Sequence, residues 1–288
     1  MGKNEALGIP SDFAGAEYMQ LKEQENMERQ FIDILDLLRQ IMDDKSIPEF
    51  QNQDKRMRFI NWGYTELVYV LEVGRKKYTV LVGQPDVEFG VVKKEYDNLR
   101  KLFNRHKEEV VAPIYYMKNP QNTKEAYITP YLYQARCIAD SGGSWGVYIP
   151  EPEYHFEPFS NKQRNIINAC MIATIIKLFD EKNNLGIASC HLGGGDFMLE
   201  KGFENEECNY ENILKRMKLI SAREFTEMTL EKYIETIRRE FVKRTFSEEY
   251  KDKIIINNRC KIPMTDSEIE YGIKLGLQLR NKNQEIER

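Results

Sequence analysis

Apolar residues recur at helical spacing in residues 24–44, the first patterned part of the chain. Charged residues fill the positions between them, so one face of a helix would be apolar and the other polar. The apolar positions are Met27, Phe31, Ile34, Leu37, Leu38 and Ile41. This spacing predicts an amphipathic helix over residues 24–44, which ends before Pro48 because proline cannot continue a helix.

The hydrophobic period then changes from helical spacing to alternation. Residues 66–73 and 77–83 are rich in β-branched and aromatic residues and flank Gly74-Arg75. They predict a β-hairpin. Residues 91–106 return to helical spacing, with apolar residues on one face. Two further runs, 110–117 and 126–133, predict strands.

The second half of the chain is patterned mainly for helices. Residues 141–158 are rich in glycine and proline and show no period, so we expect a connecting loop there. Ser160 and Gln163 form a capping-box pattern, which opens a helix that is apolar nearly all round from Ile166 to Phe179. Short strands are expected at 185–190, 197–203 and 215–225. Helices are expected at 229–241 and from the capping box at 265–268 onward. Strands in one half and helices in the other favour an α+β fold over alternating βαβ units.

Composition and charge exclude some function classes. The 288 residues include 46 acidic and 42 basic ones. The chain therefore lacks the excess of positive charge that would indicate binding to nucleic acid. No apolar run is long enough to predict a membrane span. The five cysteines are scattered without C-x-x-C spacing, which favours neither a disulfide framework nor a zinc site. We therefore expect a cytoplasmic protein whose partner is an unknown protein or small molecule.

The stretch CHLGGGDFML, residues 190–199, is the main candidate for chemistry. It lacks the Gly-Lys-Ser/Thr of a phosphate-binding loop. Cys190 and His191 are adjacent, so on a strand they would point to opposite faces, which is poor geometry for joint metal ligation. One reading is a glycine hairpin with a capping aspartate, and another is a catalytic loop.

The order hairpin, helix, two strands, loop, central apolar helix and glycine-containing loop resembles the bilobal protein-kinase-like fold. The likeness is greatest to its aminoglycoside and choline phosphotransferase branch. It implies an N-terminal helical extension (1–48), a β-rich N-lobe (49–134) and a helical C-lobe (135–288). That branch has a catalytic stretch of the form L-H-x-x-G-I-x-H-G-D-L-x-x-x-N-I-L. Here residues 185–187 and 197–199 match its apolar flanks, with Leu192 and Gly195 between them.

The resemblance also assigns roles to individual residues. His191 stands at the position of the catalytic aspartate, and Asp196 stands at that of the metal-binding asparagine. Glu95 matches the helix glutamate that pairs with a strand lysine, although residues 78–82 contain no lysine. The Asp-Phe-Gly motif is missing near residues 218–225, where Ser221, Arg223 and Glu224 are the polar candidates. Of these, Glu224 is the candidate metal ligand.

These altered positions leave two functional hypotheses. The first is a degenerate, pseudokinase-type binding or regulatory module, which needs no cofactor. The second is an active atypical phosphotransferase that uses ATP and magnesium, with His191 as the base or orienting group and Asp196 and Glu224 as metal ligands. For Glu95 the competing interpretation is a solvated charge on an amphipathic helix.

Overall fold

A computed structural model gives the fold of the chain. It describes residues 21–44, 46–62, 66–85, 87–132, 136–141, 144–149, 155–188, 196–200, 207–242 and 264–286. These residues form an α+β structure with mostly antiparallel sheets and, within these ranges, six α-helices. They group into two compact units. Unit 1 takes the residues up to Asp97 together with Ala112–Leu132, and unit 2 takes Asn98–Val111 and the residues from Tyr133 on.

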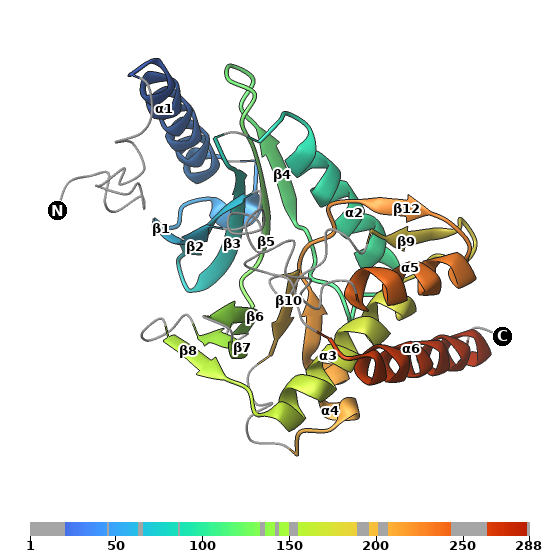
Figure 1. Ribbon diagram of the computed structural model, residues 1–288. Helices are drawn as coiled ribbons and strands as arrows, with labels where there is room; N and C mark the ends of the chain where they lie inside the picture. Colours follow the sequence, from blue (N-terminus) through green and yellow to red (C-terminus); the bar gives the residue numbers. More distant parts are fainter. Residues whose placement is uncertain are drawn as a thin grey trace. The chain divides into compact units, whose positions relative to one another are not determined.

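Unit 1 is built on one five-stranded antiparallel sheet (Figure 1). Its strand order is β1-β2-β3-β5-β4. The strands are β1 (Lys55–Trp62), β2 (Glu66–Val73), β3 (Lys76–Gly83), β4 (Tyr115–Lys118) and β5 (Glu125–Pro130). The predicted hairpin about Gly74-Arg75 is confirmed, and Gly74 has a φ of +57°, which glycine adopts without strain. Strand β1 was not predicted, although Met57 and Phe59 alternate with basic residues along it.

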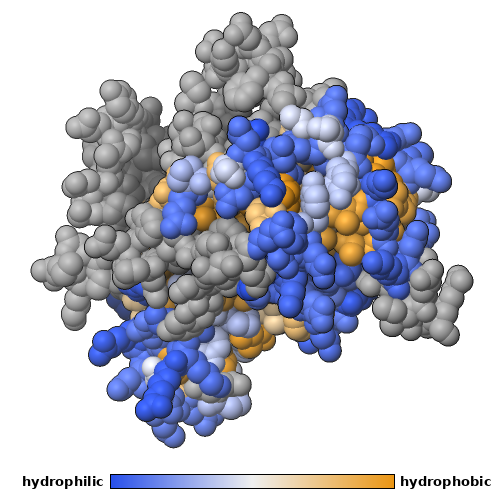
Figure 2. Space-filling model, turned by 90° about the horizontal axis from the view of Figure 1, so that it is seen from below, coloured by the Kyte–Doolittle hydropathy of each residue, from blue (hydrophilic) through white to orange (hydrophobic). Residues whose placement is uncertain are grey.

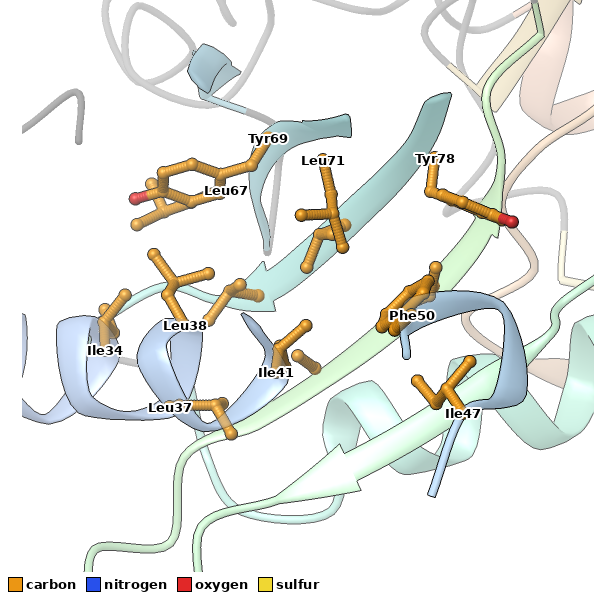
Figure 3. Packing of buried hydrophobic residues seen from close by; sticks show 14 of the residues in the cluster. Ile34, Leu37, Leu38, Ile41, Ile47, Phe50, Leu67, Tyr69, Leu71 and Tyr78 are labelled. Carbon is orange, nitrogen blue, oxygen red and sulfur yellow. The ribbon is translucent and has the colours of Figure 1, made fainter. Parts of the chain in front are cut away.

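The core of unit 1 lies between the sheet and helix α1 (Leu21–Asp43). Figure 3 shows Ile34, Leu38 and Ile41 of α1 on the side of the helix that faces β2. Leu37 belongs to the same cluster. The short 3₁₀ helix η3 (Pro48–Phe50) follows α1 and adds Phe50 to the same cluster. Because side chains alternate along a strand, Ala126 and Ile128 of β5 belong to this core.

The opposite face of β5 packs against helix α2 (Val91–Arg105). The ring centroid of Tyr96 on α2 lies 6.2 Å from that of Tyr127 on β5. The predicted helix over 91–106 is therefore confirmed, with its apolar face buried. The boundary between the two units falls within α2, after Asp97.

Unit 2 has its core between two long helices, α3 (Asn161–Lys177) and α6 (Asp266–Ile286), which lie side by side (Figure 1). The capping box that opens α3 is confirmed, because Ser160 and Gln163 bond each other's backbone. The capping box of α6 is confirmed as well: the Thr265 N–H donates to Glu268 at 2.6 Å. Helix α3 is buried around its circumference from Ile166 to Ile176, as its composition predicts.

The other elements of unit 2 are short. A five-stranded sheet has the order β11-β10-β6-β7-β8, and a two-stranded sheet pairs β12 with β9. The strands are β6 (Arg136–Ser141), β7 (Ser144–Ile149), β8 (His155–Pro158), β9 (Leu185–Ile187), β10 (Phe197–Leu199), β11 (Met217–Leu219) and β12 (Phe225–Glu227). The helices are α4 (Tyr210–Arg216) and α5 (Leu230–Val242).

The predicted loop over residues 141–158 is wrong, because β7 and β8 lie within it and pair antiparallel. The glycine content that suggested a loop has a packing role. A Cβ at Gly146 would lie 2.0 Å from the carbonyl oxygen of Glu157 on the partner strand, so only glycine allows this approach. The single strand expected at 215–225 is also wrong. Its residues form the end of α4, strand β11, a connection over 220–224 and the start of β12, and β11 and β12 pair with different strands.

The surface is mainly polar where the structure describes it. Hydrophilic residues predominate among the coloured atoms of the face in Figure 2, and hydrophobic ones occupy smaller areas between them. The large hydrophobic side chains most exposed are Ile32, Phe89, Ile114 and Tyr271. None of the described helices combines the length and the apolar character that crossing a membrane requires.

Candidate functional site

Two segments of unit 2 meet where the sequence places its candidate chemistry. One segment runs from β9 to β10, and the other runs from β11 to β12. Strand β9 pairs with β12, and β10 pairs with β11, so each segment is held by the other at both ends. At one end the Ala188 N–H donates to the Glu224 carbonyl at 2.9 Å. At the other end the Ile220 N–H donates to the Asp196 carbonyl at 2.8 Å.

The described strands on either side of residues 189–195, β9 and β10, do not form a hairpin with each other. A hairpin would join two strands that pair with each other, but β9 and β10 belong to different sheets. Each of these two strands pairs instead with a strand from later in the chain. Residues 189–195, including His191, lie outside the described residues, so the role expected for His191 stays a prediction.

Asp196 is the predicted site residue that the structure describes most fully. Its side chain is 5% exposed, and its Oδ1 lies 2.8 Å from Nη1 of Arg223. The Arg223 side chain is itself only 15% exposed. A buried carboxylate is costly unless it is paired, and the guanidinium supplies the compensating charge. The aspartate is therefore part of a largely buried ion pair.

The segment that carries Arg223 is also fixed by helix α2. Asn98 is 4% exposed. Its Nδ2 donates to the carbonyl of Ala222 at 2.9 Å and to that of Arg223 at 3.2 Å. Two backbone carbonyls are thus satisfied by one buried side chain. This arrangement holds the backbone of Arg223 in place while its side chain pairs with Asp196.

Glu224, the predicted second metal ligand, is the next residue along this segment. The structure brings its backbone beside Ala188 and its neighbour Arg223 beside Asp196. The roles of Asp196 and Glu224 as metal ligands stay predictions. The residue that contacts Asp196, however, is the arginine. Sequence reasoning named Arg223 among the polar candidates but gave it no role.

Glu95 lies in unit 1, on α2, and is fully buried. The reading of Glu95 as a solvated surface charge is therefore wrong. Burial follows from its position one turn from Val92 and Leu99, which face the core. In the middle of β3 stand Thr79 and Leu81, where the resemblance would require a lysine. Lys77, nearer the turn, pairs with Glu72 at 3.3 Å.

The residues of this site that the structure describes do not fit the magnesium ion that the resemblance implies. A metal at Asp196 would have to share the carboxylate with a guanidinium 2.8 Å away, and two cations held so close to one carboxylate repel each other. Within the described residues, no group of three or more His, Cys, Asp or Glu side chains could hold a metal ion. The Asp196 carboxylate oxygens therefore serve an internal ion pair.

Comparison of the chain with protein-family models and with curated proteins found no match.

Asn98 is the residue of this site that sequence reasoning missed. The sequence did place Asn98 on the predicted helix, next to Leu99 on the buried face. A buried amide needs a hydrogen-bond partner, and this requirement could have marked Asn98 as a candidate. No local pattern could show that the partner carbonyls lie 124 and 125 residues further along the chain.

Proposed function

We propose that this chain is a kinase-like module with degenerate catalytic motifs, which binds or regulates a partner and does not transfer phosphate. In this proposal unit 1 is the β-rich lobe and unit 2 the helical lobe of a protein-kinase-like fold. The branch it resembles is that of the aminoglycoside and choline phosphotransferases. A protein or a small molecule would be the partner.

The order of elements supports the fold part of the proposal. In unit 1, three antiparallel strands precede a helix and two more strands follow it. That helix carries a buried glutamate, Glu95, at the position matched to the helix glutamate of kinases. In unit 2, a buried helix precedes β9, and the two segments flanked by β9, β10, β11 and β12 match the catalytic and metal-binding stretches in order.

The Asp196–Arg223 ion pair is the observation that carries the functional part. In an active phosphotransferase the matched positions hold the metal that neutralises the developing charge on the phosphate. Here the Asp196 carboxylate pairs with Arg223 of the same chain, and both side chains are largely buried. Removing one partner from such a pair leaves an uncompensated charge, at a cost of about 3–5 kcal/mol. The chain therefore uses this aspartate to hold its fold.

The test compares thermal unfolding and phosphate transfer with ATP, with and without magnesium. The wild-type protein should transfer no phosphate to itself or to added small-molecule alcohols and amines. Any rise in its unfolding midpoint with ATP should be the same in magnesium and in a chelator, because no metal joins the site. Glu211→Gln, on an exposed carboxylate of α4, serves as the charge-matched control for Asp196→Asn.

Two results would contradict the proposal. One is a midpoint that rises with ATP only when magnesium is present, if Asp196→Asn abolishes the rise and Glu211→Gln retains it. The other is phosphate transfer by the wild-type protein that Glu211→Gln retains. The first result would favour an atypical phosphotransferase that uses Asp196 as a ligand, and the second would show that the chain transfers phosphate.

A further inference from the structure

A small apolar cavity opens in unit 1. Its volume is about 110 Å³. Six residues line it: Ile47, Phe50, Tyr78, Ile114, Tyr115 and Ile128. Ile47, Phe50 and Tyr78 are seen in Figure 3: Phe50 belongs to η3, Ile47 directly precedes it, and Tyr78 projects from β3. The cavity thus lies at the end of the core cluster that η3 covers.

The walls of this cavity are held in place. Phe50 and Tyr78 meet edge to face with ring centroids 5.4 Å apart. The Tyr115 hydroxyl donates to Asp44 at 2.8 Å and lies 3.2 Å from the Ser46 hydroxyl. These contacts connect each of the three aromatic rings to a neighbouring side chain. Its apolar lining suits the cavity to an apolar group, as a closed apolar cavity of roughly 150 Å³ accepts benzene.

The cavity adjoins the edge of the sheet. In the described part of unit 1, β4 is the last strand and pairs on one side only, with β5. Alternate N–H and C=O groups of such a strand point away from the sheet and can pair with another extended chain. Ile114, which directly precedes β4, is 45% exposed and forms an apolar rim. An open backbone edge and an apolar cavity therefore lie together.

We propose that β4 and this cavity form a docking site for an extended peptide segment of a partner protein. The segment would add as a strand to the open edge of β4. Residues opposite each other on neighbouring strands point to the same face of a sheet, so the residue opposite Tyr115 would point to the face where Tyr115 and Ile128 line the cavity. The volume suits one branched aliphatic or aromatic side chain, which fills the cavity and anchors the segment. This site does not depend on the function proposed above.

The probe is a phage-displayed library of random 12-residue peptides, selected on the full chain. Selected peptides should share one large apolar residue flanked by alternating residues. Ile114→Lys should weaken their binding about tenfold or more, because the anchoring side chain would then meet a charged rim in place of an apolar one. Ile47→Phe, which fills the cavity, should act similarly. Phe89→Lys is the control, since Phe89 is 59% exposed and does not line the cavity.

A second measurement tests the strand addition from the peptide side, so that it does not depend on protein variants that fold poorly. Alternate residues of an added strand direct their backbone N–H groups toward β4, and the residues between them direct theirs away. Methylation of the first set of nitrogens in a selected peptide should abolish binding, and methylation of the second set should not. The proposal fails if the library yields no peptide above background, or if Ile114→Lys and Phe89→Lys bind selected peptides equally. It also fails if Ile114 instead contacts a second copy, shown by a dimer that Ile114→Lys dissolves.

Discussion

Asp180 connects the end of α2 to the turn before β9 within unit 2. Its carboxylate accepts hydrogen bonds from the Asn183 backbone at 3.3 Å and from Asn183 Nδ2 at 2.7 Å, and it pairs with Arg105. Its own backbone exchanges two hydrogen bonds with Leu185, at 2.8 and 3.0 Å. One residue thus closes the turn in which Asn184 has a φ of +52°.

This environment predicts a dependence of stability on pH. Burial raises the pKa of Asp180, but the hydrogen bonds from Asn183 and Arg105 outweigh it and leave the pKa below the usual 3.8. A folded-state pKa below the unfolded one means that the contribution is present above pH 3.8 and is lost as the pH falls through the folded value. Asp180→Asn should lower the free energy of unfolding at pH 7 by about 1–2 kcal/mol.

Urea unfolding between pH 3 and pH 7 measures this effect. The difference between wild type and Asp180→Asn should shrink as the pH falls below about 4. Glu108→Gln, on an exposed carboxylate in the same unit, should leave the free energy of unfolding within about 0.5 kcal/mol of wild type. A difference between wild type and Asp180→Asn that is constant with pH would show that the charge has no such role.

Among the elements, α3 and α6 approach each other closely because α6 carries two glycines at the contact. A Cβ at Gly272 would lie 2.6 Å from the Ala169 carbonyl oxygen and 2.7 Å from Cβ of Ile172. At Gly276 the nearest atom would be Cβ of Ile176, at 2.8 Å. Real side chains do not reach such distances without a shift of the backbone, so the glycines set the separation of the helices.

Gly272→Ala should therefore destabilise the protein by about 1–3 kcal/mol, measured by urea unfolding. Helix propensity alone predicts the opposite sign, because alanine favours a helix over glycine by about 1 kcal/mol. The sign of the change separates the two effects. Lys274→Ala, at an exposed position of the same helix, should change stability little. A stabilised Gly272→Ala would mean that the helices are not in close contact there.

At the scale of the whole molecule, α1 is part of the core of unit 1. Phe31, Ile34, Leu37, Leu38 and Ile41 all belong to the same buried cluster as residues of β2, β3 and β5. The helix also reaches the hairpin between β4 and β5, because Asn122 Nδ2 donates to the Asp33 carbonyl at 3.3 Å. The domain boundary predicted from the sequence, which separates residues 1–48 as an N-terminal extension, stays a prediction.

Leu38→Ala tests this role of α1. Leu38 is fully buried, so its truncation should destabilise unit 1 by about 2–5 kcal/mol, because apolar burial decreases and a cavity forms. Ile32→Ala, at a position on the same helix that is 57% exposed, is the matched control and should cost little. Chemical unfolding followed by circular dichroism measures both. Equal effects of the two substitutions would mean that α1 does not pack on the sheet.

Local patterns in the sequence predicted the elements whose form depends on neighbouring residues. The spacing of Phe31 to Ile41 indicated α1, and Ser160 with Gln163 located the start of α3, because helical periodicity and capping act within a few residues. Alternation likewise identified the hairpin of β2 and β3.

The tertiary structure alone decided which distant residues meet. Gly146 lies in a strand because Glu157 pairs beside it, and Glu95 is buried because of how α2 packs. Asp196 pairs with Arg223, which belongs to a later segment of the chain. Such contacts depend on which strands pair and on how buried charges are compensated. Neither produces a periodic pattern in the sequence.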